Sequence, residues 1–129
     1  MHKIIEREES KMAKKEMEVK PIKVTDNDTG MTYTLEFDRE SIKFAESRNF
    51  DIQELEKKPM SMIPELWFYA FRMHHKMVAR EKTDKLLEGL GGIPDGLLQR
   101  LVELYTIPYK VLLPQGDENS KNSKVVVEF

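Results

Sequence analysis

The sequence contains no cysteine. This absence excludes disulfide bonds, thiolate zinc sites and thiol catalysis together, and it is compatible with a reducing compartment. The sequence also has no apolar run long enough for a membrane-spanning helix, and its first residues lack the apolar segment of a signal peptide. We therefore expect a soluble, cytoplasmic protein with no membrane partner.

Neither sign of charge is in clear excess. The chain has 21 Lys and Arg against 23 Asp and Glu, which gives a formal net charge of -2 at pH 7. Binding of duplex nucleic acid needs a concentrated basic surface, because the phosphates dominate the affinity. The charge balance therefore predicts that nucleic acid is not the partner.

A chain of 129 residues suits one domain built around one core. Residues 1–18 mix acids and bases without a sustained apolar stripe, so we interpret them as a charged N-terminal arm. Residues 19–113 carry the apolar patterns of a single globular domain, and residues 114–129 are typical of a polar, flexible tail. Within this tail, Val125–Phe129 has strand character and suits pairing with an exposed sheet edge, although a short terminal strand more often frays.

A β-hairpin is predicted at the start of the domain. Residues 19–25 and residues 31–37 both alternate apolar with polar side chains, and the segment between them ends in Gly30, which is able to take the positive φ that such a turn requires. The acidic residues Asp26 and Asp28 suggest a calcium loop, but the distal glutamate of an EF-hand is missing. A turn explains them better.

The most apolar segment is residues 61–81, for which the spacing predicts one central helix. Ser61 is expected to cap its start, and Pro64 is tolerated in the first turn. The residues that recur at helical spacing are Ile63, Leu66, Trp67, Ala70, Met73 and Met77. The predicted fold is therefore α+β and mainly α: an N-terminal β-hairpin followed by a bundle of about four to five helices around a helix rich in Trp and Phe.

Shorter helices are expected on both sides of the central one. Before it, Asp38 is placed to cap a helix that runs to Arg48, and Asp51 is placed to cap a short turn. After it, a short helix starts at Thr83 and stops at the glycines that follow Glu88. Pro94 then opens a helix, which Pro108 should break near residue 106, with one or two further turns over residues 109–113.

No catalytic, cofactor or metal site is predicted. Adjacent residues on a helix point about a hundred degrees apart, so His74 and His75 are poorly placed to chelate one metal, and we expect structural roles for them. The glycine-rich segment 89–92 lacks the Lys-Ser/Thr of a phosphate loop and follows a helix, so a helix stop is the better interpretation. The serines carry no nucleophile motif, and no enzyme class fits.

The order of these segments resembles a known family. The parts that carry the resemblance are Tyr33–Phe37, Leu66–His74 and Leu86–Tyr109, within a match over residues 19–113. They resemble the small tail-assembly chaperones of long-tailed bacteriophages and prophages of Gram-positive bacteria. The arm at residues 1–18 is longer than that family leads us to expect.

The resemblance implies a non-enzymatic protein of the host cytoplasm that is absent from the mature virion. It would bind and solubilise the phage tape-measure protein, a long helical chain with apolar stripes, during tail morphogenesis. The major tail protein and a second copy of the chain remain open as further partners. Many members of this class also have a longer form made by ribosomal frameshifting, in which residues 115–124 would be a linker.

The partner-binding side chains are expected on an apolar groove between the central helix and the helix that follows Pro94. We expect Trp67, Phe71 and Tyr105 to anchor these two helices against each other. The candidate binding residues are Leu66, Phe68, Phe71, Met73, Met77, Leu101, Tyr105 and Tyr109.

Two alternatives remain. A structural head–tail connector of a phage would have similar size, helices and charge, but it would form a stable ring and stay in the virion. A DNA-binding regulator would need a recognition helix with clustered bases, and residues 95–105 offer only Arg100.

Overall fold

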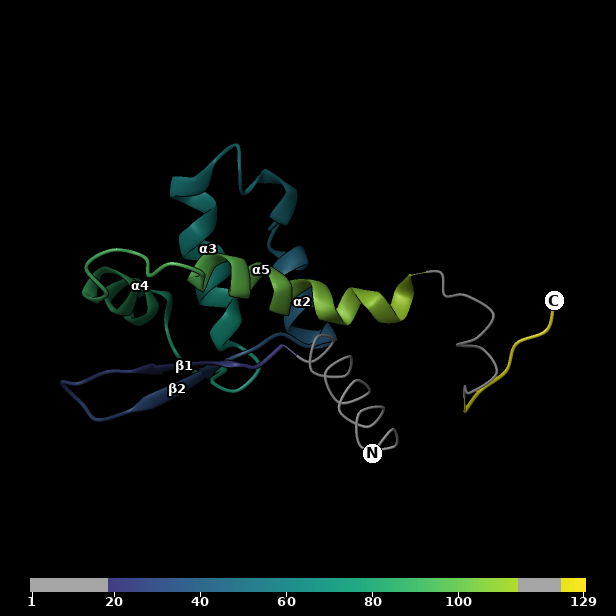
Figure 1. Cartoon of the computed structure of the whole chain (residues 1–129), viewed down its shortest axis with the longest axis horizontal. Helices are drawn as coiled ribbons and strands as arrows, with labels where there is room; N and C mark the ends of the chain where they lie inside the picture. The colour runs from purple at the N-terminus through teal and green to yellow at the C-terminus, as the bar shows by residue number, and fades with distance from the viewer. Residues whose placement is uncertain (1–18, 114–123) are drawn as a thin grey trace, which may run out of the picture.

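The computed structural model describes residues 19–113 and 124–129 of the chain (Figure 1). A two-stranded antiparallel hairpin precedes four α-helices and two short 3-10 helices in this part of the chain, so the predicted α+β, mainly α class is confirmed. The elements are β1 (Ile22–Thr25), β2 (Thr32–Leu35), α2 (Arg39–Ser47), η1 (Ile52–Glu54), α3 (Pro59–Phe71), α4 (Arg80–Gly89), α5 (Leu97–Thr106) and η2 (Ile107–Leu112). The predicted arm, residues 1–18, lies outside the described residues, as does most of the predicted tail.

The hairpin forms where it was predicted, with shorter strands. Val24 of β1 lies opposite Tyr33 of β2, and both are buried on the face that meets the helices. Gly30 has a φ of 76°, and its N–H donates to the carbonyl of Asp26 over 2.7 Å. The Asp26 carboxylate accepts the N–H of Asp28 over 3.0 Å, so this residue stabilises a turn, as expected.

Helix α2 begins with the predicted cap. The Asp38 carboxylate accepts the N–H of Ser41 over 2.8 Å, and the Ser41 hydroxyl accepts the N–H of Asp38 over 2.9 Å. Each side chain thus satisfies a backbone donor of the other residue, which is the reciprocal arrangement of a capping box. Asp51 caps η1 in the simpler way, by accepting the N–H of Gln53 over 2.9 Å.

The predicted central helix over residues 61–81 is wrong at both ends. Helix α3 starts at Pro59, so Ser61 lies inside the helix and does not cap it. It ends at Phe71, and residues 72–79 turn toward the hairpin, where the ring nitrogen Nε2 of His75 accepts the backbone N–H of Thr34 over 2.9 Å. The chain makes this tertiary contact instead of continuing the helix that the apolar periodicity predicts. Met77 is therefore in the turn, where it is 95% exposed.

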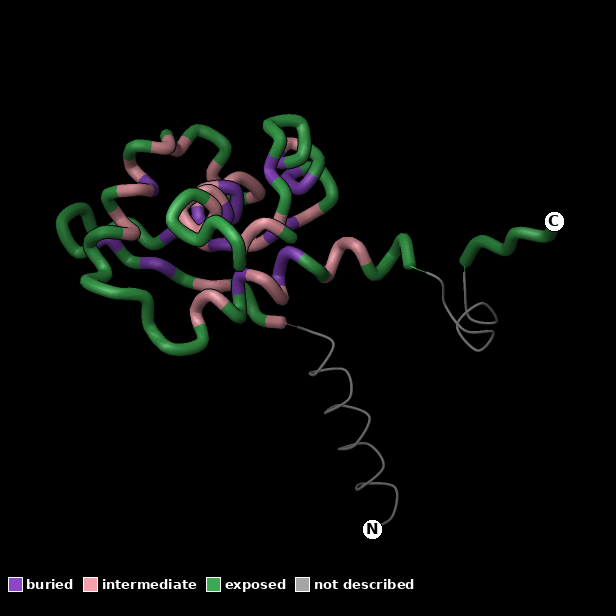
Figure 2. Tube along the Cα trace, turned by 90° about the horizontal axis from the view of Figure 1, so that it is seen from above, coloured by how far each residue is buried: buried purple, intermediate pink, exposed green. Residues whose placement is uncertain are grey.

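The core surrounds α3, as predicted (Figure 2). The Trp67 side chain is fully buried, and its indole N–H donates to the carbonyl of Thr83 over 2.8 Å, which ties α3 to α4. Tyr105 of α5 is buried between the rings of Phe37 and Phe50, with centroid distances of 5.0 and 5.6 Å. Trp67, Phe71 and Tyr105 thus share one core, and their role as anchors of α3 against α5 stays a prediction.

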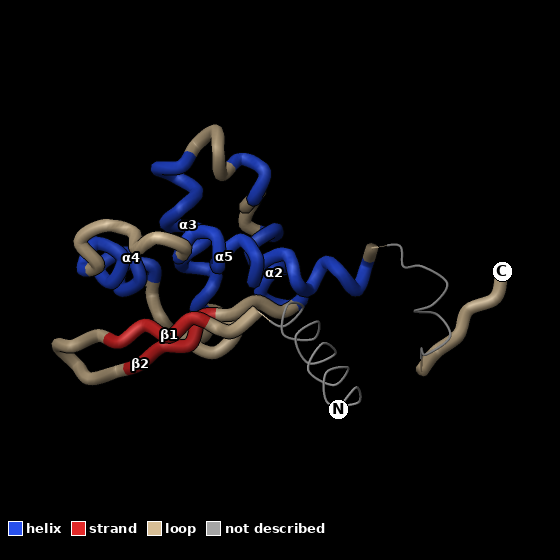
Figure 3. Tube along the Cα trace, in the orientation of Figure 1, coloured by secondary structure: helices blue, strands red, loops and turns tan. Residues whose placement is uncertain are grey.

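The C-terminal helices differ from prediction mainly at their starts. Figure 3 shows α4 and α5, which a loop joins. Helix α4 begins at Arg80, three residues before the predicted Thr83, and α5 begins at Leu97 because Gly96, with a φ of 86°, precedes it. The predicted break before Pro108 is confirmed, since η2 starts at Ile107. Residues 125–129 are exposed and form no strand. Among the described residues, no helix is long and apolar enough to cross a membrane.

Candidate protein-binding surface

The short helix η2 presents apolar side chains to solvent. Pro108 lacks the N–H that an α-helix would use at this position, so α5 gives way to a 3-10 helix there. Three consecutive residues at its end are largely exposed: Val111 by 73%, Leu112 by 65% and Leu113 by 54%. Adjacent exposed apolar residues of this kind mark interaction sites more often than scattered single ones do.

Tyr109 fixes η2 against the rest of the domain. Its hydroxyl donates to the carboxylate of Glu46 in α2 over 3.2 Å, and it lies 3.5 Å from the hydroxyl of Tyr105. Burial, together with the hydrogen bond to Tyr109, raises the pKa of Tyr105 well above its usual value. Tyr105 therefore stays protonated at neutral pH and acts as a packing and hydrogen-bonding group.

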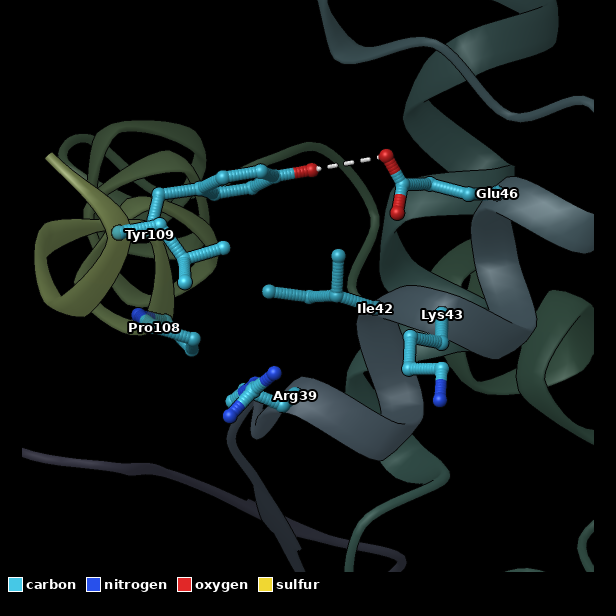
Figure 4. Close-up of a pocket in the computed structure, with 7 residues that line it drawn as sticks. Arg39, Ile42, Lys43, Glu46, Pro108 and Tyr109 are labelled. Carbon is cyan, nitrogen blue, oxygen red and sulfur yellow. Dashed lines mark hydrogen bonds between the residues drawn. The ribbon is translucent and has the colours of Figure 1, made fainter.

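One hollow lies between η2 and α2 (Figure 4). Ile42 of α2 forms its apolar base and faces the ring of Tyr109. Pro108 and Leu112 line the η2 side. Arg39 and Lys43 lie along α2 at the edge, so the apolar base has a polar rim.

A second hollow lies on the other side of η2. Phe50 and Ile52 line it from the η1 region, and Tyr105 and Leu113 line it from the C-terminal helices. Tyr109 and Glu46 border both hollows, so the two are adjacent. We refer to this region as the Tyr109 surface, defined by Ile42, Glu46, Ile52, Pro108, Tyr109, Leu112 and Leu113.

The eight candidate binding residues do not form one groove. Four of them are almost completely buried in the core and have no accessible surface for a partner: Leu66, Phe71, Leu101 and Tyr105. The expected groove between α3 and α5 is therefore filled by the side chains that were expected to line it. Of the eight, only Tyr109 belongs to the Tyr109 surface.

The remaining three candidates lie on other parts of the molecule. Phe68 is partly buried against the core. Met73 follows the end of α3 and lines a separate hollow with Phe44 and Arg72, whose guanidinium lies 3.5 Å from the Phe44 ring centroid. Met77 is exposed in the turn before α4. The helix that would have aligned these residues ends at Phe71.

Most of the Tyr109 surface was missed from the sequence. Neither Ile42 nor Ile52 was expected to bind a partner, and Leu112 was expected only as part of a helical turn. The available signal was the apolar run Val111–Leu113, because consecutive residues of a helix point in different directions and cannot all face the core. No local pattern indicates that α2 and η1 lie on either side of it.

His74 and His75 have separate structural partners. The ring nitrogen Nε2 of His74 lies 2.8 Å from the carboxylate of Glu36, whereas Nε2 of His75 accepts the backbone N–H of Thr34. No group of three or more potential metal ligands occurs in residues 19–113 and 124–129. The two histidines thus connect the turn before α4 to β2.

The His75 contact predicts a specific pH dependence. Burial, with smaller contributions from His74 and Lys23, lowers the pKa of His75 below its usual 6.5. The unfolded chain therefore binds this proton more readily than the folded chain, so stability falls as the pH drops below about 6.5. Replacing His75 with Gln keeps an acceptor for Thr34 but removes the titration.

We expect the melting temperature of His75→Gln to change less between pH 7 and pH 5 than that of the wild type. Circular dichroism melts at matched ionic strength measure both slopes. All other residues are common to the two proteins, so the comparison isolates position 75. Equal slopes would contradict the assigned acceptor role of His75.

A comparison with known sequences places the chain in a family. Residues 12–129 match the profile of a domain of unknown function, DUF5055. The match covers most of the chain, and the protein therefore belongs to this family. The matched region starts within the predicted arm and extends through the predicted tail, so it is longer than the predicted domain of residues 19–113. No curated protein and no solved structure matches the chain.

Proposed function

We propose that this protein is a non-enzymatic tail-assembly chaperone that binds apolar helical stretches of a phage tape-measure protein. The observation that carries the proposal is the Tyr109 surface, where two adjacent hollows with apolar linings flank exposed leucines. The family resemblance of residues 19–113 supplies the identity of the partner. In this proposal the protein acts in the host cytoplasm, before the tail is completed.

The chemistry of the surface suits an amphipathic helix. Such a helix binds by laying its apolar face into an apolar groove, with anchors spaced three or four residues apart. Two adjacent hollows provide two places for such anchors. Tyr109 lies between them and is held by Glu46, so its ring contributes contact area with little loss of side-chain entropy.

Co-expression tests the proposal. The full chain is expressed together with the tape-measure protein of the same genome, and the soluble fraction is separated by size-exclusion chromatography with mass detection. We expect the tape-measure protein to be insoluble alone and to co-elute with several copies of this chain. A tape-measure protein that stays insoluble would contradict the proposal.

The same experiment, together with virion composition, separates the chaperone from a head–tail connector. A chaperone is absent from purified virions, whereas a connector remains in them at a fixed copy number. Quantitative mass spectrometry of purified particles measures this difference. Finding the chain in virions, as a closed ring of more than two copies, would replace the chaperone with the connector.

A further inference from the structure

One edge of the β-hairpin has no backbone partner among the described residues. In an antiparallel ladder, alternate residues bond to the partner strand, and the residues between them direct their backbone groups outward. Asp26 bonds to Met31, and Thr34 donates its N–H outward to His75. By this alternation, the N–H and C=O groups of Lys23 and Thr25 point away from β2, and no described residue bonds to them.

The other edge of the hairpin is occupied. Besides the bond from Thr34 to His75, the N–H of Glu36 donates to the carbonyl of Ala70 over 3.0 Å. The turn after α3 and the end of α3 thus cover the β2 side. The outer edge of β1 is the side of the hairpin that remains able to accept another strand.

A hollow lies next to this edge, and residues of β1, the hairpin turn and α4 line it. Val24 of β1 and Leu86 and Leu90 at the end of α4 supply its apolar lining, and Asp26, Lys82 and Lys85 add charged groups beside them. Leu90 is 37% exposed. A strand added beside β1 would direct every second side chain toward this hollow, which is the arrangement of peptide-binding domains that combine a strand edge with a neighbouring helix.

The chain also carries a segment with the matching pattern. Val125–Phe129 contains three consecutive β-branched residues, which favour strands. Val125, Val126 and Val127 are exposed by 77%, 72% and 74%, and Phe129 is fully exposed. In a single chain, both the edge and the segment are therefore exposed to solvent.

We propose that Val125–Phe129 of one copy of this protein adds as an antiparallel strand to the open edge of β1 in a second copy. In the register proposed, Glu128 lies opposite Lys23, where unlike charges stabilise a cross-strand pair. In this register Val127 lies opposite Val24 and Val125 lies opposite Asp26, so both are on the face of β1 that lines the hollow. The other faces of the added strand and of β1 stay in water.

The exchange is reciprocal, because each copy has one β1 edge and one Val125–Phe129 segment. In two copies related by a twofold axis, the segment of each copy pairs with the β1 edge of the other, which closes the assembly as a dimer. The proposal concerns association of this chain with itself, so it holds or fails without the tape-measure protein. The Tyr109 surface is formed by other elements and is not used in it.

The test starts with the oligomeric state of the full chain. Sedimentation equilibrium over a wide concentration range gives the dissociation constant of the wild type, for which we expect a dimer. Thr25→Pro removes the outward N–H of β1, which no described group accepts in the single chain, and edge strands tolerate proline at such positions. Thr25→Val is the matched control, because it keeps the N–H and the β-branched shape.

We expect Thr25→Pro to weaken the dimer at least about tenfold, because the backbone hydrogen bond to the second copy is lost and the carbonyl that accepted it is left unpaired. A tenfold change corresponds to about 1.4 kcal/mol. We expect Thr25→Val to leave the dissociation constant unchanged. Val127→Asp should weaken it similarly by placing a carboxylate against Val24. Circular dichroism melts verify that each variant is folded. A wild type that stays monomeric, or variants that dimerise equally well, would overturn the proposal.

A charge exchange tests the register. Lys23→Glu and Glu128→Lys should each weaken the dimer, by up to about fivefold for an exposed cross-strand pair, and the double variant should restore it. Hydrogen exchange identifies the strand edge that forms the contact, since the amides of Lys23 and Thr25 should be protected only in the dimer. Protection of these amides in a monomer would show addition within one chain and would overturn the exchange between copies.

Discussion

Replacing Trp67 with alanine should lower the melting temperature by about 15 °C or more. The side chain is fully buried, and truncation of a buried tryptophan typically costs about 3–5 kcal/mol. For a domain of this size, each kcal/mol corresponds to a shift of about 4–8 °C. The loss is increased because the carbonyl of Thr83 would lose the indole N–H that it accepts.

Trp67→Phe separates packing from hydrogen bonding. Phenylalanine keeps an aromatic ring against Phe71 but has no N–H for Thr83, so we expect a loss smaller than that of Trp67→Ala. Far-ultraviolet circular dichroism is the suitable measurement, because Trp67 is the only tryptophan and its fluorescence disappears in both variants. A melting temperature of Trp67→Ala equal to the wild type would place this side chain outside the core.

Replacing Leu112 with aspartate should abolish co-elution with the tape-measure protein and leave the fold intact. Leu112 is 65% exposed, so an aspartate there stays in water in the free protein, and surface changes of this kind usually alter stability by less than about 0.5 kcal/mol. In the complex, the carboxylate would face an apolar helix, and burial of an unpaired charge is costly.

Met77→Asp is the matched control for this variant. Met77 is also exposed and apolar, but it lies in the turn before α4 and not on the Tyr109 surface. We expect Met77→Asp to co-elute with the tape-measure protein as the wild type does. The opposite result, in which Met77→Asp loses binding and Leu112→Asp keeps it, would move the binding surface to the turn after α3.

The sequence predicted those parts of the fold that depend on local chemistry. The hairpin followed from alternating side chains and from Gly30, which takes the positive φ that its turn requires. The cap at Asp38 and the break before Pro108 followed from the hydrogen-bonding capacity of single residues. The burial of Trp67 followed from its position on an apolar helical face.

The end of α3 was not predictable in this way. The periodicity of apolar residues continues to Met77, and no proline or glycine occurs between Phe71 and Met77. The helix ends at Phe71 in a structure where His75 accepts a hydrogen bond from Thr34, a residue 41 positions earlier in the chain. A contact of this range has no local signature, so helix propensity and periodicity gave too long a helix.

The candidate binding surface illustrates the same limit. Apolar residues near α3 were expected to serve both the core and a partner, and the structure assigns Leu66, Phe71 and Leu101 to the core. The Tyr109 surface combines side chains from α2, the η1 region and η2, which are distant in sequence. Only the tertiary arrangement brings Ile42 next to Tyr109.

The most direct test of tape-measure binding by the Tyr109 surface is hydrogen exchange of the full chain, alone and in its co-expressed complex with the tape-measure protein. Exchange should slow in η2 and in the facing residues of α2, because a bound helix would exclude water from both hollows. Exchange in η2 that is the same in the complex as in the free protein would contradict binding at this surface.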